Sequence, residues 1–552
     1  GMGKRTNTIL QSAFFKLADI MPIDEAVDYM KQAAKKSYGK KGDAVVEMNY
    51  KAIDAGVDAV HKVEVPESWH NPAPDAPAKE LAGRPELVKM VRDVMEPVAR
   101  MDGDSLPVSA FAKNPNGEWE LGASAYEKRG TAVMVPEWNA EKCIQCNQCA
   151  FVCSHATIRP FCLTADEIAA APASLKSADL KPKPGEYKFT MAVSPLDCMG
   201  CGECVTVCPT KAIEMKPQES QADQQAAFDY CVENIRKKPG MMAETTVKGS
   251  QFNQPLLEFS GSCAGCAETS YARLITQLFG EKMFISNATG CSSIWGGTAS
   301  ISPYTVNKES GHGPAWINSL FEDNAEHGLG MQIGYETVRE NLIKKVEALK
   351  GKNAELDAVI DKYLETKANT KANDQPAKDL IAALEADGSA EAKEILADKQ
   401  FLAKKSFWIF GGDGWAYDIG YGGLDHVLAS GHDVNVMVFD TEMYSNTGGQ
   451  ASKASNIGEV CQFAAAGKEI SKKSLSEICM TYGYIYVAQI ALGANMAQAV
   501  KAIAEAEAYP GPSIIIGYAP CELHGVKGGM TNCQNEMKKA VESGYWNLFT
   551  FN

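Results

Sequence analysis

Eight cysteines between positions 143 and 208 repeat one spacing, Cys-x2-Cys-x2-Cys-x3-Cys, twice. This thiolate pattern is typical of a module with two [4Fe-4S] clusters, in which the fourth cysteine of each run completes the other cluster. A protein with such clusters moves single electrons. The expected ligands are Cys143, Cys146, Cys149 and Cys208 for one cluster, and Cys198, Cys201, Cys204 and Cys153 for the other.

A glycine-rich turn that includes Gly412, Asp413 and Gly414 directly follows a predicted apolar strand at 407–410. Glycines at a strand end let the backbone approach a diphosphate. A carboxylate such as Asp413 can then give a hard oxygen ligand to Mg2+ that bridges the phosphates. The next predicted strand, 434–439, also ends in a polar, glycine-rich loop. Because ligands bind at the carboxyl ends of parallel strands, the two loops together favour such a site over a simple tight turn.

A third group of cysteines lies outside the repeated runs. Cys263 and Cys266 form a Cys-Ala-Gly-Cys segment that precedes Glu268, and Cys291 and Cys521 follow much later in the chain. Cys263 and Cys266 alone fit either a redox pair or half of a zinc site. Composition does not decide between these readings.

Length and charge limit the classes of function. A chain of 552 residues is too long for one core and predicts three or four domains. The formal net charge of −15 argues against a nucleic-acid partner, which needs clustered Lys and Arg. We find no apolar run long enough for a membrane span and no secretory signal, so the expected location is cytoplasmic.

The seventeen cysteines do not indicate a disulfide framework, because such frameworks belong to small secreted domains. Five of them fit no ligand spacing and are predicted to be buried small hydrophobic residues. These are Cys162, Cys231, Cys461, Cys479 and Cys533.

Apolar, β-branched stretches alternate with helical patterns in the second half of the chain, which indicates a parallel α/β sheet. Before it, 335–400 is rich in Ala, Glu, Lys and Leu and is predicted to form an inserted helical hairpin. The segment 9–39 predicts two helices and 45–62 a third, whereas 65–77 reads as an extended linker and 230–260 as a polar connector. The predicted strands are 407–410, 434–439, 484–490 and 513–518.

The strings around the two glycine-rich loops resemble the diphosphate and Mg2+ motif of thiamine-diphosphate enzymes. Gly411-Gly412-Asp413-Gly414-Trp415-Ala416-Tyr417-Asp418-Ile419-Gly420 and Tyr444-Ser445-Asn446-Thr447-Gly448-Gly449-Gln450, with the order of elements along nearly the whole chain, are similar to the C-terminal half of pyruvate:ferredoxin (flavodoxin) oxidoreductases. This family belongs to the 2-oxo acid:ferredoxin oxidoreductases.

The resemblance implies roles for particular residues. Thr441 and the Met443 carbonyl would join Asp413 on Mg2+, and Asn446 would lie beside the thiazolium and the substrate. A third [4Fe-4S] cluster would be bound by Cys263, Cys266, Cys291 and Cys521. Glu268 and Cys291 would also line the thiamine site, with Gly412, Gly414 and Trp415 around the cofactor.

The resemblance also implies a division into domains. Residues 1–70 would end a coenzyme A domain, 71–130 would connect, 131–230 would form a bacterial-type 2[4Fe-4S] ferredoxin-like α+β domain, and 231–552 would bind thiamine diphosphate. The overall class would thus be α/β, with a partial α/β domain at the N-terminus. Asn7 and Asn49 would contact coenzyme A, although caps or turn residues explain them equally well.

The implied activity is oxidation of pyruvate to acetyl-CoA and CO2, with electrons passing to ferredoxin or flavodoxin, in a homodimer. The groups that bind pyruvate and activate thiamine belong to N-terminal domains of the family, so we expect this chain to be inactive without those domains or a partner subunit. Two alternatives stay open: an electron-transfer module without catalysis, or a related enzyme acting on 2-oxoglutarate, branched-chain 2-oxo acids or indolepyruvate.

Overall fold

The computed structural model describes residues 6–70, 80–181, 186–238, 240, 242–298 and 300–552. The chain forms two compact units, Gly1–Leu81 and Ala82–Asn552. Among the described residues, no helix is both long enough and apolar enough to cross a membrane.

The smaller unit consists mainly of three helices, α1 (Asn7–Ala18), α2 (Ile23–Tyr38) and α3 (Asp43–Asp58), as the helical spacing predicts. Helices α1 and α3 approach each other closely at Gly56, where an added Cβ would lie 2.3 Å from the carbonyl oxygen of Ile9. The core here is small and includes Val46 and Ile53. A short helix, α4 (Glu67–His70), lies in the predicted linker, and the rest of that linker beyond residue 70 lies outside the described residues.

A seven-stranded sheet forms the centre of the larger unit, in the order β14-β12-β13-β9-β8-β6-β7. All neighbouring pairs are parallel except β14 with β12, so the predicted parallel α/β sheet is confirmed with one antiparallel edge. Runs of apolar residues make the central strands, because a strand covered on both faces needs no polar alternation. The strands are β6 (Met283–Ala288), β7 (Ala315–Ser319), β8 (Ser406–Gly412), β9 (Asn435–Asp440), β12 (Tyr486–Ile490), β13 (Ser513–Tyr518) and β14 (Phe549–Phe551).

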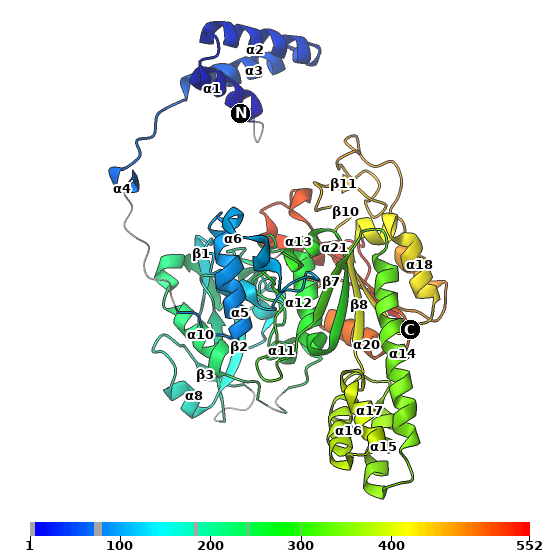
Figure 1. Ribbon diagram of the computed structural model, residues 1–552. Coiled ribbons are helices and arrows are strands. Elements are labelled where there is room, and N and C mark those ends of the chain that lie inside the picture. Colours follow the sequence, from blue (N-terminus) through cyan, green and yellow to red (C-terminus); the bar gives the residue numbers. More distant parts are fainter. Residues whose placement is uncertain (1–5, 71–79, 182–185, 239, 241, 299) are drawn as a thin grey trace. The chain divides into compact units, whose positions relative to one another are not determined.

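Helices pack around this sheet and bury one continuous core (Figure 1). Helix α14 contacts β6, β8 and α18, and α20 contacts β12 and β13. The helices of this part are α11 (Val247–Ser250), α12 (Ala267–Phe279), α13 (Cys291–Gly296), α14 (Asn324–Ala348), α18 (Tyr421–Ala429), α19 (Leu475–Met480), α20 (Met496–Ala508) and α21 (Cys533–Glu542).

The inserted segment is helical as predicted, but the prediction of a two-helix hairpin was wrong. Helix α14 continues into three further helices, α15 (Ala354–Thr366), α16 (Asp374–Asp387) and α17 (Ala390–Ala397), which share a separate apolar core at one end of α14 (Figure 1). Gly388 ends α16 in the left-handed conformation (φ +62°), and Ser389 caps α17, so the chain reverses once more than the composition suggested.

The cysteine-rich part has the α+β architecture predicted for a two-cluster ferredoxin. Strands β1 (Met134–Trp138) and β5 (Ile213–Pro217) pair antiparallel, and β4 (Lys188–Val193) pairs with both β2 (Ile158–Leu163) and β3 (Ala178–Asp179). Each cysteine run carries one short helix, α7 (Gln148–Val152) in the first and α9 (Glu203–Thr206) in the second.

The flanking segments are also largely helical. The predicted connector at 230–260 is partly wrong, because helix α10 (Gln224–Asn234) extends into it and α11 lies within it. The remaining helices are α5 (Pro85–Met90), α6 (Glu96–Ala99) and α8 (Ala165–Ala169). All five cysteines that fit no ligand spacing are buried, as predicted.

Candidate functional site

Four adjacent strands of the sheet end at the same edge, and each is followed by predicted site residues. The order β13-β9-β8-β6 places the loops with Cys521, Thr441, Asp413 and Cys291 side by side. This edge is where an open α/β sheet binds its ligands. Residues more than 200 positions apart in sequence therefore meet at one place.

The three predicted Mg2+ ligands converge after β8 and β9. Thr441 Oγ1 lies 2.8 Å from Asp413 Oδ1 and 2.9 Å from the carbonyl oxygen of Met443, and the Thr441 backbone N–H donates to the same carboxylate oxygen at 3.0 Å. Asp413 is fully buried, and burial together with the charge of Asp440 raises its pKa to about 8. Burial of a charged carboxylate costs free energy, and a bound cation would offset that cost.

Steric crowding explains two of the glycines in the turn, Gly411 and Gly414. A Cβ at Gly414 would lie 2.4 Å from the ring of Tyr444, and one at Gly411 would lie 2.3 Å from the ring of Trp415. Gly412, at the end of β8, meets no such neighbour. Trp415 is fully buried beneath the turn. Its ring therefore supports the shape of the glycine-rich turn.

The third group of cysteines also gathers at this edge. Cys263 and Cys266 precede α12, Cys291 begins α13, and Cys521 follows β13. Burial and then the charge of Glu268 raise the pKa of Cys291, with Cys266 and Cys521 as further anionic neighbours. The four thiols thus lie around one place, although Cys263 is exposed.

Glu268 and Asn446 differ in their surroundings. Glu268 is buried, its Oε2 has no hydrogen-bond partner among the described residues, and burial raises its pKa to about 7. Such an orphaned polar atom fits a site whose ligand supplies the partner. Asn446 is exposed on the loop after β10 (Met443–Tyr444), beside Ser445, whose Oγ lies 3.4 Å from Cys291 Sγ.

The structure brings cysteines of the two runs close to one another. Cys143, Cys146, Cys149 and Cys208 line one small cavity together. Burial and then Cys201 and Cys153 raise the pKa of Cys204, with smaller contributions from Cys149 of the first set and from Cys198, so the second set lies together and close to the first. Among the described residues, no three His, Cys, Asp or Glu side chains lie close enough to hold a single metal ion.

The two runs share their backbone geometry, which supports an internal duplication. A backbone N–H two residues on donates to the first sulfur of each run, from Gln145 to Cys143 (3.3 Å) and from Gly200 to Cys198 (3.4 Å). Four residues after the last cysteine another N–H donates to that sulfur, at 3.4 Å for Cys153 and 3.2 Å for Cys208. Donors of this kind orient cluster ligands and stabilise thiolate charge.

One contact joins the cysteine-rich part to the third cysteine group. Gly265, between Cys263 and Cys266, has φ +76°, and a Cβ added to it would lie 3.4 Å from the Cβ of Cys201. Thr531 Oγ1 also donates to the Cys201 carbonyl oxygen at 2.5 Å. The Gly265 backbone therefore lies close to the side chain of Cys201.

Several residues that support this edge had no sequence signal of their own. Ser452 Oγ donates to Asp413 Oδ2 at 2.6 Å, and Lys472 pairs with Asp440 at 2.9 Å and with Glu442 at 3.0 Å. His524 Nε2 lies 2.7 Å from the Thr441 carbonyl oxygen, which ties the Cys521 loop to the Thr441 loop.

The two predicted coenzyme A contacts belong to the smaller unit, whereas the residues described above belong to the larger one. Asn7 is exposed at the start of α1. Asn49 is buried in α3, where its Nδ2 donates to the Val45 carbonyl oxygen at 2.8 Å. In this arrangement the amide of Asn49 is used within its own helix.

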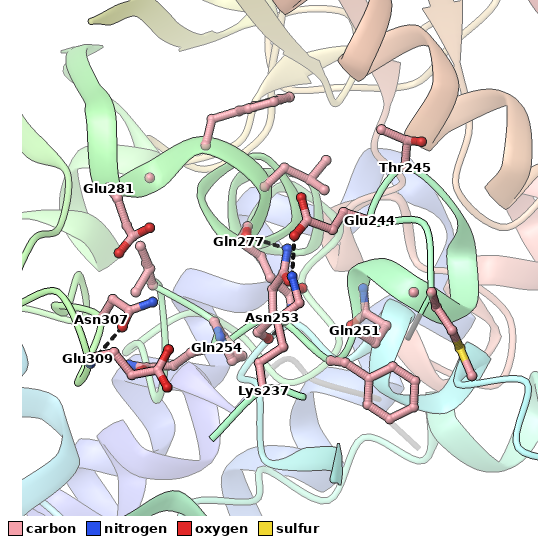
Figure 2. A pocket seen from close by; sticks show the side chains of 18 of the residues that line it. Lys237, Glu244, Thr245, Gln251, Asn253, Gln254, Gln277, Glu281, Asn307 and Glu309 are labelled. Carbon is pink, nitrogen blue, oxygen red and sulfur yellow. Dashed lines mark hydrogen bonds and ion pairs between the residues drawn. The ribbon is translucent and has the colours of Figure 1, made fainter. Parts of the chain in front are cut away.

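A cavity of about 600 Å³ lies elsewhere (Figure 2). Its lining includes Glu281 and Lys282, just before β6, and Glu507, near the end of α20, so it lies toward the amino ends of the strands. Charges in its wall pair with one another, as in the Lys282–Asp374 ion pair at 2.8 Å. We therefore place the candidate site at the carboxyl edge and not in this cavity.

Comparisons with known proteins agree with these two modules. The 4Fe-4S dicluster domain matches residues 142–212, and the C-terminal TPP binding domain of thiamine pyrophosphate enzymes matches 362–516. A domain of unknown function, named EKR, matches 75–132. The module types expected from the cysteine runs and the glycine-rich loops are thus confirmed.

Similar proteins match along the whole chain. A pyruvate-flavodoxin oxidoreductase from Klebsiella pneumoniae is 50% identical over 100% of this chain and 47% of its own length. A pyruvate-flavodoxin oxidoreductase from Enterobacter agglomerans is 49% identical over 99% of this chain and 47% of its own length. A pyruvate:ferredoxin oxidoreductase from Moorella thermoacetica is 49% identical over 100% of this chain and 47% of its own length.

The chain spans about half the length of these curated relatives. The identity extends through the cluster module and the thiamine module alike, so the match is not confined to one common domain. Along its whole length the chain is therefore homologous to pyruvate:ferredoxin (flavodoxin) oxidoreductases, and its two modules fit that family.

Proposed function

We propose that this chain is the cluster- and thiamine-binding half of an enzyme that oxidises pyruvate to acetyl-CoA and CO2 and passes the electrons to ferredoxin or flavodoxin. The observation that carries the proposal is the convergence of Asp413, Thr441 and Met443 beside the cysteine group of Cys291 and Cys521 at one sheet edge.

The donor set at this edge fits Mg2+ and a diphosphate. Asp413, Thr441 and the Met443 carbonyl are oxygen donors, and Mg2+ prefers one or two carboxylates together with phosphate oxygens. Gly412 leaves the backbone of the turn open to a phosphate group. When bound, thiamine diphosphate would supply a carbon nucleophile and an electron sink for decarboxylation of a 2-oxo acid. Glu268 and Asn446 would line the reaction side of that cofactor.

The cysteine groups suggest a direction for the electrons. The group of Cys263, Cys266, Cys291 and Cys521 would hold the first [4Fe-4S] cluster next to the thiamine site. Gly265 in its loop lies close to Cys201, so the next cluster would be the one held by Cys153, Cys198, Cys201 and Cys204. The set with Cys143, Cys146, Cys149 and Cys208 would then deliver electrons to the external carrier.

The remaining assignments concern the domains of this chain and the half that it lacks relative to its longer relatives. We assign 1–70 to the end of a coenzyme A domain, with Asn7 and Asn49 as candidate contacts, and 71–130 to a connecting segment. The ferredoxin-like domain would be 131–230 and the thiamine domain 231–552. Groups that bind the pyruvate carboxylate and activate thiamine would come from the half that the longer relatives carry, in a homodimer.

An anaerobic assay tests the activity. The purified chain should not reduce a viologen dye with pyruvate and coenzyme A, whereas adding a chain with the missing domains should restore reduction that needs both substrates. Full activity of the chain alone would contradict its role as a half. Activity restored by 2-oxoglutarate, a branched-chain 2-oxo acid or indolepyruvate in place of pyruvate would point to a related enzyme.

Cofactor content tests the site separately. Iron and acid-labile sulfide should both approach about twelve atoms per chain, the sum of three four-iron clusters. An iron content of about eight atoms per chain would mean that the cluster beside the thiamine site is absent. Thiamine diphosphate with Mg2+ should raise the melting temperature, because a ligand that binds only the folded state stabilises it. No rise would favour a module that only transfers electrons.

A further inference from the structure

Arg273, on α12, is buried without an acidic partner. Only 1% of its surface is exposed, and none of the ion pairs among the described residues includes it. Its Nη1 donates to the side-chain oxygens of Gln277 (2.7 Å) and Gln251 (3.2 Å), and its Nη2 donates to the Phe151 carbonyl oxygen (2.5 Å). These acceptors are all neutral, and Nε has no partner in the described part of the chain.

Other buried arginines of the larger unit are arranged differently. Arg159 pairs with Glu258 at 2.5 Å, and Arg339 with Glu336 at 3.4 Å. A guanidinium stays protonated in proteins, so a buried one without a carboxylate is costly. Some other negative charge should offset the cost at Arg273.

The candidate is the second cluster site. Arg273 donates to the carbonyl of Phe151, which lies in α7 between Cys149 and Cys153, and Ser270 of the same helix donates to the carbonyl of Val152, directly before Cys153. Burial lowers the pKa of Arg273 to about 10, whereas the negative charge of Cys153 acts against that shift and Arg159 adds to it. Arg273 therefore remains charged near neutral pH, beside a ligand of the set with Cys198, Cys201 and Cys204.

We propose that Arg273 is the counter-charge of this cluster and raises its reduction potential. The inference rests on the proposed function, because it requires the cluster to be present. A [4Fe-4S] core with four thiolates is an anion and gains one further negative charge on reduction, so a fixed positive charge stabilises the reduced form more than the oxidised form. Net charge near a cluster is among the factors that set its potential.

The position of Arg273 suggests why a raised reduction potential at this cluster would be useful. Helix α12 begins directly after Cys266, so it connects the cysteine group at the sheet edge with the cluster of Cys153. A higher potential at that second cluster favours electron flow away from the thiamine site. Arg273 acts through space on the cluster and does not ligate it.

The test is anaerobic redox titration of the whole cluster-loaded chain, followed by electron paramagnetic resonance. The signal of this cluster is assigned by its loss in Cys204→Ala. In Arg273→Gln its reduction equilibrium constant should fall about tenfold, which is about 59 mV toward negative potential for one electron. Arg273→Lys keeps the charge and should stay near the wild type. The signal of the cluster at Cys143 serves as the internal control and should not move.

A second variant keeps the test decisive if Arg273→Gln loses its cluster. Gln251→Glu leaves the arginine in place but puts a carboxylate at its Nη1, and it should produce the same negative shift. An unchanged potential in whichever of these variants retains the cluster would overturn the inference, as would an equal shift of both signals. Iron content separates the outcomes: a wild-type chain without the cluster refutes the proposed function, whereas an intact but unshifted cluster refutes only the role of Arg273.

Discussion

At the scale of single residues, Asp413 has a carboxylate whose charge is disfavoured by burial but whose oxygens are well hydrogen-bonded. Asp413 is fully buried and near Asp440, yet it accepts hydrogen bonds from Thr441 and Ser452. The donors hold the carboxylate in place, whereas burial disfavours its charge. A residue that is oriented but electrostatically unfavourable fits a function in ligand binding better than one in stability.

Replacing Asp413 by Asn tests this difference. The amide can keep a bond to Thr441 through its oxygen and can donate to Ser452 Oγ, while the buried charge disappears. The ligand-free variant should therefore melt at the same temperature as the wild type or slightly above it. The rise produced by thiamine diphosphate and Mg2+ should be lost, because the metal loses its carboxylate.

Asp433→Asn is a suitable control for this experiment, since Asp433 pairs with Lys404 just before β9, toward the opposite edge of the sheet. It should keep the full ligand-induced rise. A normal rise in Asp413→Asn would show that Asp413 does not hold the metal.

Gly414 tests the steric requirement of the turn. An added methyl would lie 2.4 Å from the rigid ring of Tyr444, so Gly414→Ala should destabilise the chain by about 1–3 kcal/mol and weaken thiamine diphosphate binding. Gly422→Ala is the matched control, because Gly422 lies in α18 with nothing within 4 Å of the added atom. That change should stabilise by up to about 1 kcal/mol. Urea unfolding measures both, and equal effects would contradict the steric argument.

At the scale of elements, a half-buried lysine, Lys472, fastens the loop that carries Thr441. Lys472 comes from the long segment after β11 (Gln450–Ala451) and bridges Asp440 and Glu442, on either side of Thr441. Burial alone would lower the pKa of Lys472, but the two carboxylates outweigh it and the pKa is raised. Glu442 has φ +62°, so the loop keeps an unfavourable backbone conformation that these contacts maintain.

Lys472→Met should leave two buried carboxylates uncompensated and cost about 3 kcal/mol of folding free energy. Lys473→Met is the matched control: Lys473 donates to the Tyr417 carbonyl and lies over the Tyr421 ring, and its loss should cost about 1 kcal/mol. Chemical denaturation measures the difference. Adding Glu442→Gln to Lys472→Met should recover part of the loss, and no recovery would contradict the bridging role.

Sequence patterns predicted some of these elements and missed others for physical reasons. Asp413 and Thr441 follow strands that are continuous apolar runs, so the strands and their common edge could be inferred. Strand β6 was missed because Ser286 and Asn287 interrupt its apolar pattern, and both are buried with hydrogen bonds to Asn324 and Ser292. Lys472 could not be predicted because its partners come from another part of the chain and only the folded loop brings them together.

At the scale of the whole molecule, the three cysteine groups differ in their access to solvent. Cys149, Cys198 and Cys204 are buried within the two ferredoxin-like sets, whereas Cys263 of the third group is exposed. The third group is also assembled from distant segments, before α12, at α13 and after β13, while each run of the other two lies within eleven residues of sequence. The proposed first cluster should therefore be the least protected in this chain.

Stepwise removal of iron tests this order. A chelator added anaerobically to the cluster-loaded chain should first lower the iron content from about twelve to about eight atoms, and the remaining iron should leave much more slowly. Cys521→Ala should start near the lower value, because it removes one ligand of the exposed site. Cys461→Ala is the control, since Cys461 is a buried cysteine assigned to no cluster. Loss of all iron in a single phase, or loss that begins with the signal of the Cys143 set, would contradict the proposed arrangement, because it would mean that the solvent-exposed thiol does not mark the most accessible cluster.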